Sequence, residues 1–210
     1  MKLVSQRSYA PVLWGLALAG VVIDQATKYG VFRWLYNEAD HQGEYEVVPG
    51  AFRLLAQFTN QPEPRDQLLG RLRTFSGDLL PKVNHGALFG LGGEHTHIAN
   101  SLFAAVSIIA AIAIIYWSRR RSTSSDLALC VALGLILAGT LGNLYDRVVF
   151  HGVRDFLYFY WIEWPVFNVA DCCLVLGAAL LLAQAFWNRP ATGVHEVRQP
   201  SLSPEVAHVE

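Results

Sequence analysis

The stretch "LALCVALGLILAGTLGNLYDR" (127–147) decides the fold of this chain. It carries no charged side chain until Asp146 and Arg147 close it, and most of its residues are apolar. A helix that crosses a bilayer needs about 20 predominantly apolar residues. The stretch therefore predicts a membrane-spanning helix that ends in a polar group formed by Asn143 and Asp146.

Three other segments are apolar enough to span a membrane, namely 11–32, 98–117 and 165–187. The 210 residues are 53% hydrophobic and 16% charged, which suits one membrane-embedded domain better than a soluble one. The first segment follows Lys2 and Arg7, as a secretory signal peptide would. However, it continues into a charged segment without a small-residue cleavage pattern, so a retained span is favoured.

Short charged connections predict the orientation of the spans. The connection after the second span contains three arginines (119–121), which favours the cytoplasmic side. Both termini are then expected in the cytoplasm, with 33–97 and 148–164 outside. The net charge is −1, so the chain lacks the excess of positive charge that is typical of proteins that bind nucleic acid.

The outer connection 33–97 is expected to contain a small sheet. Its β-prone part, 43–58, flanks a Pro-Gly pair and predicts a hairpin. The segment 60–82 is rich in proline, glycine and charge, and is interpreted as a surface insertion. The polar tail 188–210 is predicted to be a disordered cytoplasmic extension.

A second Asn-x-x-Asp stands in "FNVADCC" (167–173), where the last apolar run begins. The third and fourth spans run in opposite directions, so Asp146 and Asp171 are expected at one depth near the outer surface. Residues three apart share a helix face, which places Asn143 and Asn168 beside these acids. The pattern predicts four polar side chains in one cleft.

The first span adds Asp24 and Lys28, four residues apart and on the same helix face. An acid that precedes a base at this spacing forms a favourable ion pair. We expect this pair to make the charges tolerable at that depth and to brace the cleft.

Intramembrane carboxylates are costly, by roughly 2.5–3.5 kcal/mol at a span centre, so they usually face a bundle interior or a water-filled cavity. Two close carboxyls tend to share one proton, and one can then activate water while the other polarises a peptide carbonyl. This is aspartic-protease chemistry. The same residues could relay protons in a transporter or simply cap helix ends at the interface, and composition does not decide among these.

Five segments in this order and spacing resemble lipoprotein signal peptidases, also called signal peptidase II: "VVIDQATK", "NHGALFG", "GTLGNLYDR", "GVRDF" and "FNVADC". The resemblance covers about residues 10–187. It implies a mainly α membrane protein with four transmembrane helices and a small extracytoplasmic β-cradle. It also implies an aspartic endopeptidase of the bacterial inner membrane that removes the signal peptide from diacylglyceryl-modified prolipoproteins, cutting before the lipidated cysteine.

Carried onto this chain, the resemblance makes 1–187 the peptidase domain and Asp146 with Asp171 the catalytic pair. It implies no metal and no cofactor, with prolipoproteins and membrane lipid as partners; we expect a monomer. The insertion at 60–82, Leu88 and Cys172 depart from the usual family pattern. The residues that it assigns to support or substrate binding are Asp24, Lys28, Asn84, Gly86, Asn143, Arg147, Asn168 and Ala170.

Two other functions stay open at this stage, a proton-coupled transporter and a non-catalytic assembly factor. A transporter needs acidic residues that are reachable from both faces, whereas the intramembrane acids here fall in the outer half. An assembly factor would tolerate the loss of either aspartate. The depth of the acids therefore favours a protease.

Overall fold

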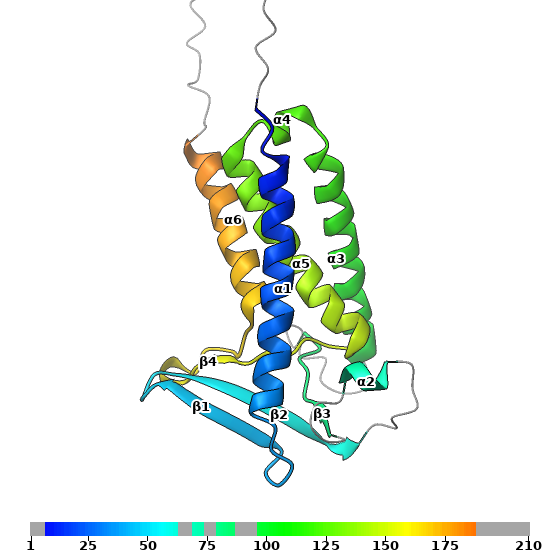
Figure 1. The fold of residues 1–210 in the computed structure, drawn as a ribbon, viewed down its shortest axis with the longest axis vertical. Helices are drawn as coiled ribbons and strands as arrows, with labels where there is room; N and C mark the ends of the chain where they lie inside the picture. Colours follow the sequence, from blue (N-terminus) through cyan, green and yellow to red (C-terminus); the bar gives the residue numbers. More distant parts are fainter. Residues whose placement is uncertain (1–6, 63–68, 74–78, 87–95, 188–210) are drawn as a thin grey trace, which may run out of the picture.

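The computed structural model describes residues 7–62, 69–73, 79–86 and 96–187, and in these ranges four helices are long and apolar enough to cross a bilayer. They run side by side as a bundle, with a sheet at one end (Figure 1). The four predicted spans are therefore confirmed. The spanning helices are α1 (Ala10–Trp34), α3 (Thr96–Ser118), α5 (Leu127–Val149) and α6 (Val169–Trp187).

Side-chain caps set two of the helix starts. Asp126 precedes α5, and its carboxylate accepts a hydrogen bond from the backbone N–H of Leu129 at 2.9 Å. Such a cap satisfies one of the donors that a helix start leaves free. The fourth helix starts at Val169 and not at residue 165 as expected, because Asn168 caps it and the chain before it is extended.

Helix α5 lies at the centre of the bundle and packs against α1, α3 and α6. Glycines allow these close contacts. A Cβ atom at Gly142 would lie 2.6 Å from a carboxylate oxygen of Asp24, and one at Gly139 would lie 2.3 Å from the carbonyl oxygen of Ala170. Small residues let membrane helices approach closely. Here they bring polar groups of three helices together at one end of the bundle.

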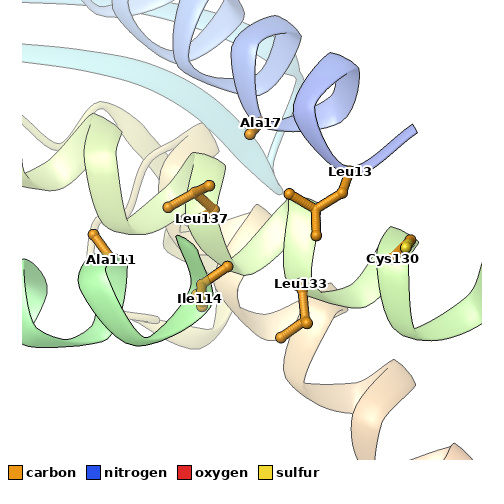
Figure 2. Close-up of a cluster of buried hydrophobic side chains, with 7 residues drawn as sticks. All are labelled: Leu13, Ala17, Ala111, Ile114, Cys130, Leu133 and Leu137. Carbon is orange, nitrogen blue, oxygen red and sulfur yellow. The ribbon is translucent and has the colours of Figure 1, made fainter. Parts of the chain in front are cut away.

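The apolar core of the bundle lies toward the other end. Its side chains come from α1, α3 and α5 and interdigitate between these helices (Figure 2). Cys130 belongs to this core and is fully buried. The cluster consists of Leu13, Ala17, Ala111, Ile114, Cys130, Leu133 and Leu137.

The sheet is antiparallel and is built around its longest strand, β2 (Phe52–Pro62). Strand β1 (Gln42–Val48) forms the expected hairpin with it, while β3 (Leu79–Pro81) and β4 (Leu157–Phe159) pair with other parts of β2. The β4 strand brings the connection between α5 and α6 onto the sheet. The predicted small sheet in the 33–97 connection is confirmed.

Both ends of the 60–82 segment belong to the sheet, because β2 continues to Pro62 and β3 lies at 79–81. A short helix, α2 (Gly70–Arg73), lies between them. Leu79 packs with Phe32, Phe58 and other apolar side chains in a second cluster, which fixes the sheet to the end of α1. Leu79 and Pro81 are therefore buried and do not lie on the surface as expected, whereas the interpretation of 60–82 as an insertion stays a prediction. Leu88 and the tail 188–210 lie outside the described residues.

Two short helical elements complete the described chain. Helix α4 (Arg121–Ser124) lies in the arginine-rich connection, at the end of the bundle opposite the sheet (Figure 1). The turn η2 (Tyr160–Ile162) follows β4 on the sheet side. The start of α1 lies beside α4, where the N–H of Tyr9 donates to the carbonyl of Ser124 at 2.6 Å.

Candidate active site

Asp171 lies in the first turn of α6, in a reciprocal cap with Asn168. The N–H of Asp171 donates to Oδ1 of Asn168 at 3.0 Å, and Oδ2 of Asp171 accepts the N–H of Asn168 at 3.2 Å. This is the geometry of a capping box, with aspartate in the usual position of glutamate. The positive end of the helix dipole favours a negative charge there. Asn143 of α5 donates a further hydrogen bond to Oδ1 of Asp171 at 2.8 Å.

A second carboxyl, Asp155, lies beside this cap, in the connection that precedes β4. Its Oδ1 accepts a hydrogen bond from Nδ2 of Asn168 at 2.7 Å, and its Oδ2 accepts one from Nδ2 of Asn84 at 3.1 Å. Asn168 therefore binds both acids, Asp155 through its side chain and Asp171 through its backbone. Two carboxyl groups from separate segments share one asparagine.

The environment of Asp155 favours its protonated form. Burial, followed by the negative charge of nearby Asp171, raises the pKa of Asp155 from 3.8 to about 6. Two close carboxyls resist double ionisation, so such a pair keeps one proton up to a higher pH than an isolated carboxyl would. Asp155 and Asp171 thus have the electrostatic relation that the sequence analysis expected of Asp146 and Asp171.

Asp146 occupies a different position and makes no described contact with Asp171. It is fully buried, and Arg154 donates to it three times: from Nη2 at 2.7 Å, from Nε at 3.1 Å and from the backbone N–H at 2.9 Å. Lys28 lies 3.4 Å away, and Gln25 donates at 3.2 Å. With its oxygens engaged by two cations, this carboxylate is poorly placed to accept a proton from water. The expected pairing of Asp146 with Asp171 is therefore not the one that the geometry favours.

The ion pair expected between Asp24 and Lys28 is present, with an Nζ–Oδ2 distance of 2.9 Å, and both residues are fully buried. Asp24 also accepts the backbone N–H of Ala170, at the start of α6, at 2.9 Å. Lys28 donates to Oδ1 of Asn143 at 3.1 Å. The pair thus braces the cleft, as expected, by holding the start of α6 and the asparagine that contacts Asp171.

Asp24, Lys28, Asp146 and Arg154 form one buried charge cluster with two positive and two negative groups. Its charges cancel, which limits the cost of placing them among membrane helices. The guanidinium of Arg154 also lies 4.2 Å from the ring centre of Tyr29 and 3.9 Å from that of Phe150. Because Arg154 immediately precedes Asp155, the cluster fixes the backbone from which Asp155 projects.

Asn84 and Gly86 approach the site from the segment after β3. Asn84 pairs with Val153 through two backbone hydrogen bonds of 2.7 and 2.9 Å, which places its side chain against Asp155. Gly86 has φ +91°, a conformation that side chains disfavour, and a Cβ atom there would lie 2.3 Å from the ring of Phe103. Glycine is therefore required for the turn after Asn84.

Of the other predicted residues, Ala170 is fully buried and supplies the N–H that binds Asp24. Arg147 contacts its own helix and a neighbouring ring: its Nη1 donates to the carbonyl of Asn143 at 3.4 Å, and its guanidinium lies 5.3 Å from the ring centre of Phe103. Its hydrogen bond to the backbone of Asn143 stabilises the last turns of α5.

A cavity of about 300 Å³ opens beside Asp155. Gln57, Lys82, Asn84 and Asp155 are the polar residues that line it. Leu55 of β2, Val83 and Val166 provide apolar surface on the other sides. This volume is at the lower end of the range for ligand pockets, and it suits a short segment of a peptide substrate with small side chains. The carboxyl pair therefore adjoins a space in which a peptide chain could lie.

Sequence reasoning missed Asp155, Arg154 and Gln25. The signal for Asp155 was present in "GVRDF" (152–156), but this segment lies outside every apolar run. Helical spacing linked Asp146 to Asn143, but it gives no information about Asp155, because Asp155 does not lie on a helix. The partner of Asp146, Arg154, lies eight residues away across a turn that no periodicity describes.

The raised pKa of Asp155 predicts a pH dependence of stability. The folded protein binds this proton more tightly than the unfolded chain, whose pKa is near 3.8, so the contribution is complete below about pH 4 and is lost as the pH rises through about 6. The difference corresponds to roughly 2–3 kcal/mol. We expect the melting temperature of Asp155→Asn in detergent to fall less between pH 5 and pH 8 than that of the wild type. Parallel curves would contradict the assignment of the pKa.

The fold and site define an integral membrane enzyme with a paired-carboxyl site at one end of a four-helix bundle. A family model described as signal peptidase (SPase) II matches residues 67–187. The chain belongs to the signal peptidase II family, and it is therefore a peptidase. The resemblance found in the sequence is confirmed.

Individual relatives agree with the family match. A lipoprotein signal peptidase of Rhodopirellula baltica is 34% identical over 190 residues, covering 83% of this chain and 71% of the relative. One of a Methylobacterium species is 34% identical over 183 residues, covering 85% and 92%. A bacterial membrane enzyme solved by the in meso method at 1.9 Å has a similar fold, with a TM-score of 0.63 and 24% identity over 88% of this chain and 99% of that one.

Proposed function

We propose that this protein removes the signal peptide from diacylglyceryl-modified prolipoproteins, cutting before the lipidated cysteine, with Asp155 and Asp171 as the catalytic pair. The observation that carries the assignment of this pair is the sharing of Asn168 by both carboxyls, next to a cavity. Family membership favours this function over the transporter and the assembly factor, because the family is one of peptidases.

The two acids have different roles in the proposed reaction. Asp171 sits at a helix start and accepts two N–H hydrogen bonds, which hold its carboxyl group in a fixed position. It acts as the general base and takes a proton from water. Asp155, with its raised pKa, holds the shared proton and donates it toward the scissile carbonyl.

Attack of water on the scissile carbonyl then gives a tetrahedral intermediate, and the two carboxyl groups carry out the proton transfers. Water oxygen bonds to the carbonyl carbon, its proton passes to Asp171, and the carbonyl oxygen takes the proton of Asp155. Collapse of the intermediate breaks the C–N bond: the proton on Asp171 moves to the leaving nitrogen, and one hydroxyl of the intermediate returns its proton to Asp155. This leaves a carboxylic acid and restores the pair. Asn84, Asn143 and Asn168 hold the two carboxyls in position throughout.

We propose that the site faces the outer surface and that both ends of the chain are cytoplasmic. The protein is a multi-pass membrane protein with four apolar helices. The three arginines 119–121 lie at the bundle end opposite the sheet, next to the start of α1. Positive charge in a short connection favours the cytoplasmic side. We also propose that the enzyme is a monomer.

In this orientation the substrate stays anchored in the membrane while it is cut. Exposed aromatic residues of the 156–167 connection, among them Trp161 and Trp164, suit the boundary between lipid and water at the level of the site. The acyl chains of the substrate remain in the bilayer, where each buried methylene contributes roughly 0.8 kcal/mol. The small cavity then needs few specific peptide contacts.

Removal of the lipid from the substrate should therefore cause a large loss of cleavage. We expect the same prolipoprotein without its diacylglyceryl group to be processed far more slowly, mainly through a higher KM, by the purified enzyme in mixed micelles. Cleavage of the lipidated precursor on the same day and in the same micelles is the control. Equal rates for the two precursors would instead identify a general intramembrane protease.

A further inference from the structure

A second cavity lies at the opposite end of the bundle from the carboxyl pair and has a volume of about 560 Å³. One side is polar and is formed by Arg120, Ser122 and Thr123 in the connection between α3 and α5. The floor is apolar and consists of Leu129 and Leu133 of α5 together with Leu181 of α6. We call this cavity the inner groove. It combines a cationic end with a hydrocarbon surface.

Aromatic side chains also line the inner groove. Tyr116 and Trp117, at the end of α3, are about half exposed and contribute to its wall. The guanidinium of Arg120 lies 4.6 Å from the ring centre of Tyr116 and donates to its hydroxyl, which holds the cation at the groove. Aromatic residues at this level are typical of the membrane–water boundary. The groove therefore offers a cation for a lipid headgroup and apolar side chains for an acyl chain.

The charge around the inner groove favours an anion. Arg119, Arg120 and Arg121 are all exposed there. The acid of the same connection, Asp126, accepts hydrogen bonds from the backbone of Leu129 and from Gln184, at 2.9 and 3.2 Å. It is thus engaged in holding α5 and α6 together. Basic pockets between membrane helices on the cytoplasmic side bind anionic lipid headgroups.

We propose that the inner groove binds an anionic glycerophospholipid, with the phosphate at Arg120 and one acyl chain along the leucine floor. The site is separate from the one that receives the substrate, because Leu133 in the groove and Asn143 beside Asp171 are ten residues apart on α5, about 15 Å at the usual rise per residue. Assignment of the lipid to the inner leaflet rests on the proposed orientation. The selectivity for an anionic headgroup does not rest on it.

The test compares two charge-neutralising variants of the full chain in native mass spectrometry from detergent. Purified protein is incubated with phosphatidylglycerol or phosphatidylcholine of identical acyl chains, and the lipid retained is counted. We expect the wild type to retain phosphatidylglycerol preferentially and Arg120→Gln to lose about fivefold in this retention, the effect of roughly one interfacial charge. Arg119→Gln is the matched control, because it removes the same charge from the neighbouring exposed residue, which does not line the groove.

Three results would overturn the proposal. Equal retention of the two lipids would show that the groove has no preference for an anionic headgroup. Equal losses in Arg119→Gln and Arg120→Gln would indicate diffuse surface charge instead of a site. Displacement of phosphatidylglycerol by an equimolar amount of inorganic phosphate would identify a phosphate site without a lipid. None of these results bears on the carboxyl pair, whose activity is measured separately.

Discussion

Asp155→Asn should abolish cleavage of a diacylated prolipoprotein, with a fall in turnover of about 10³-fold or more. The carboxyl of Asp155 carries the proton that the scissile carbonyl needs, and an amide cannot exchange it. Asparagine has nearly the same shape, and the surrounding Asn84 and Asn168 remain in place. The measurement is a single-turnover assay with purified enzyme, corrected for the folded fraction.

Asp171→Asn should give the same result, because the reaction needs both members of the pair. Its backbone cap with Asn168 can still form through the side-chain oxygen, so the start of α6 is expected to persist. Turnover near the wild-type level in either folded variant would exclude that aspartate from the chemistry. Addition of a chelator to the wild type is expected to leave turnover unchanged.

Asp146→Asn should instead act mainly on stability, with a loss of roughly 3–5 kcal/mol. The substitution leaves Arg154 and Lys28 buried with Asp24 as the remaining anion of the cluster. A buried charge without its partner is costly, and this loss is a large part of the roughly 5–15 kcal/mol that holds a typical domain together. Thermal unfolding in detergent at neutral pH measures it.

Asp155→Asn is the matched control for this effect, because it removes one negative charge from a neighbouring segment without leaving a cation unpaired. It should unfold at or above the wild-type temperature at pH 7.5, where ionised Asp155 is destabilising. An Asp146→Asn protein that melts with the wild type would show that the buried cluster contributes little to the fold.

The spans could be predicted from the sequence because the bilayer imposes a simple requirement of length and apolarity. All four predicted segments are helices, and the hairpin around Pro49 and Gly50 followed from local turn chemistry. The start of α6 was placed too early, since Pro165 and Val166 are apolar but belong to the extended wall of the cavity. Hydropathy alone does not distinguish a lining residue from a helical one.

The site was predictable only in part. Asp171, Asn143 and Asn168 were grouped correctly, because helical spacing and antiparallel spans bring them together. The two Asn-x-x-Asp patterns look equivalent in sequence. However, Asn168 and Asp171 lie at the start of α6, whereas Asn143 and Asp146 lie near the end of α5. Only the tertiary structure shows that Arg154 returns to neutralise Asp146 and thereby leaves the neighbouring Asp155 to pair with Asp171.

The double variant Asp146→Asn/Arg154→Gln tests the central claim most directly. It removes one negative and one positive group, so the buried cluster keeps Asp24 with Lys28 and remains neutral. The assignment of the chemistry to Asp155 and Asp171 predicts that the folded fraction of this variant still cleaves diacylated prolipoprotein, at least about tenfold faster than Asp155→Asn under the same conditions. A folded double variant that is as inactive as Asp155→Asn would contradict the claim and return Asp146 to the reaction.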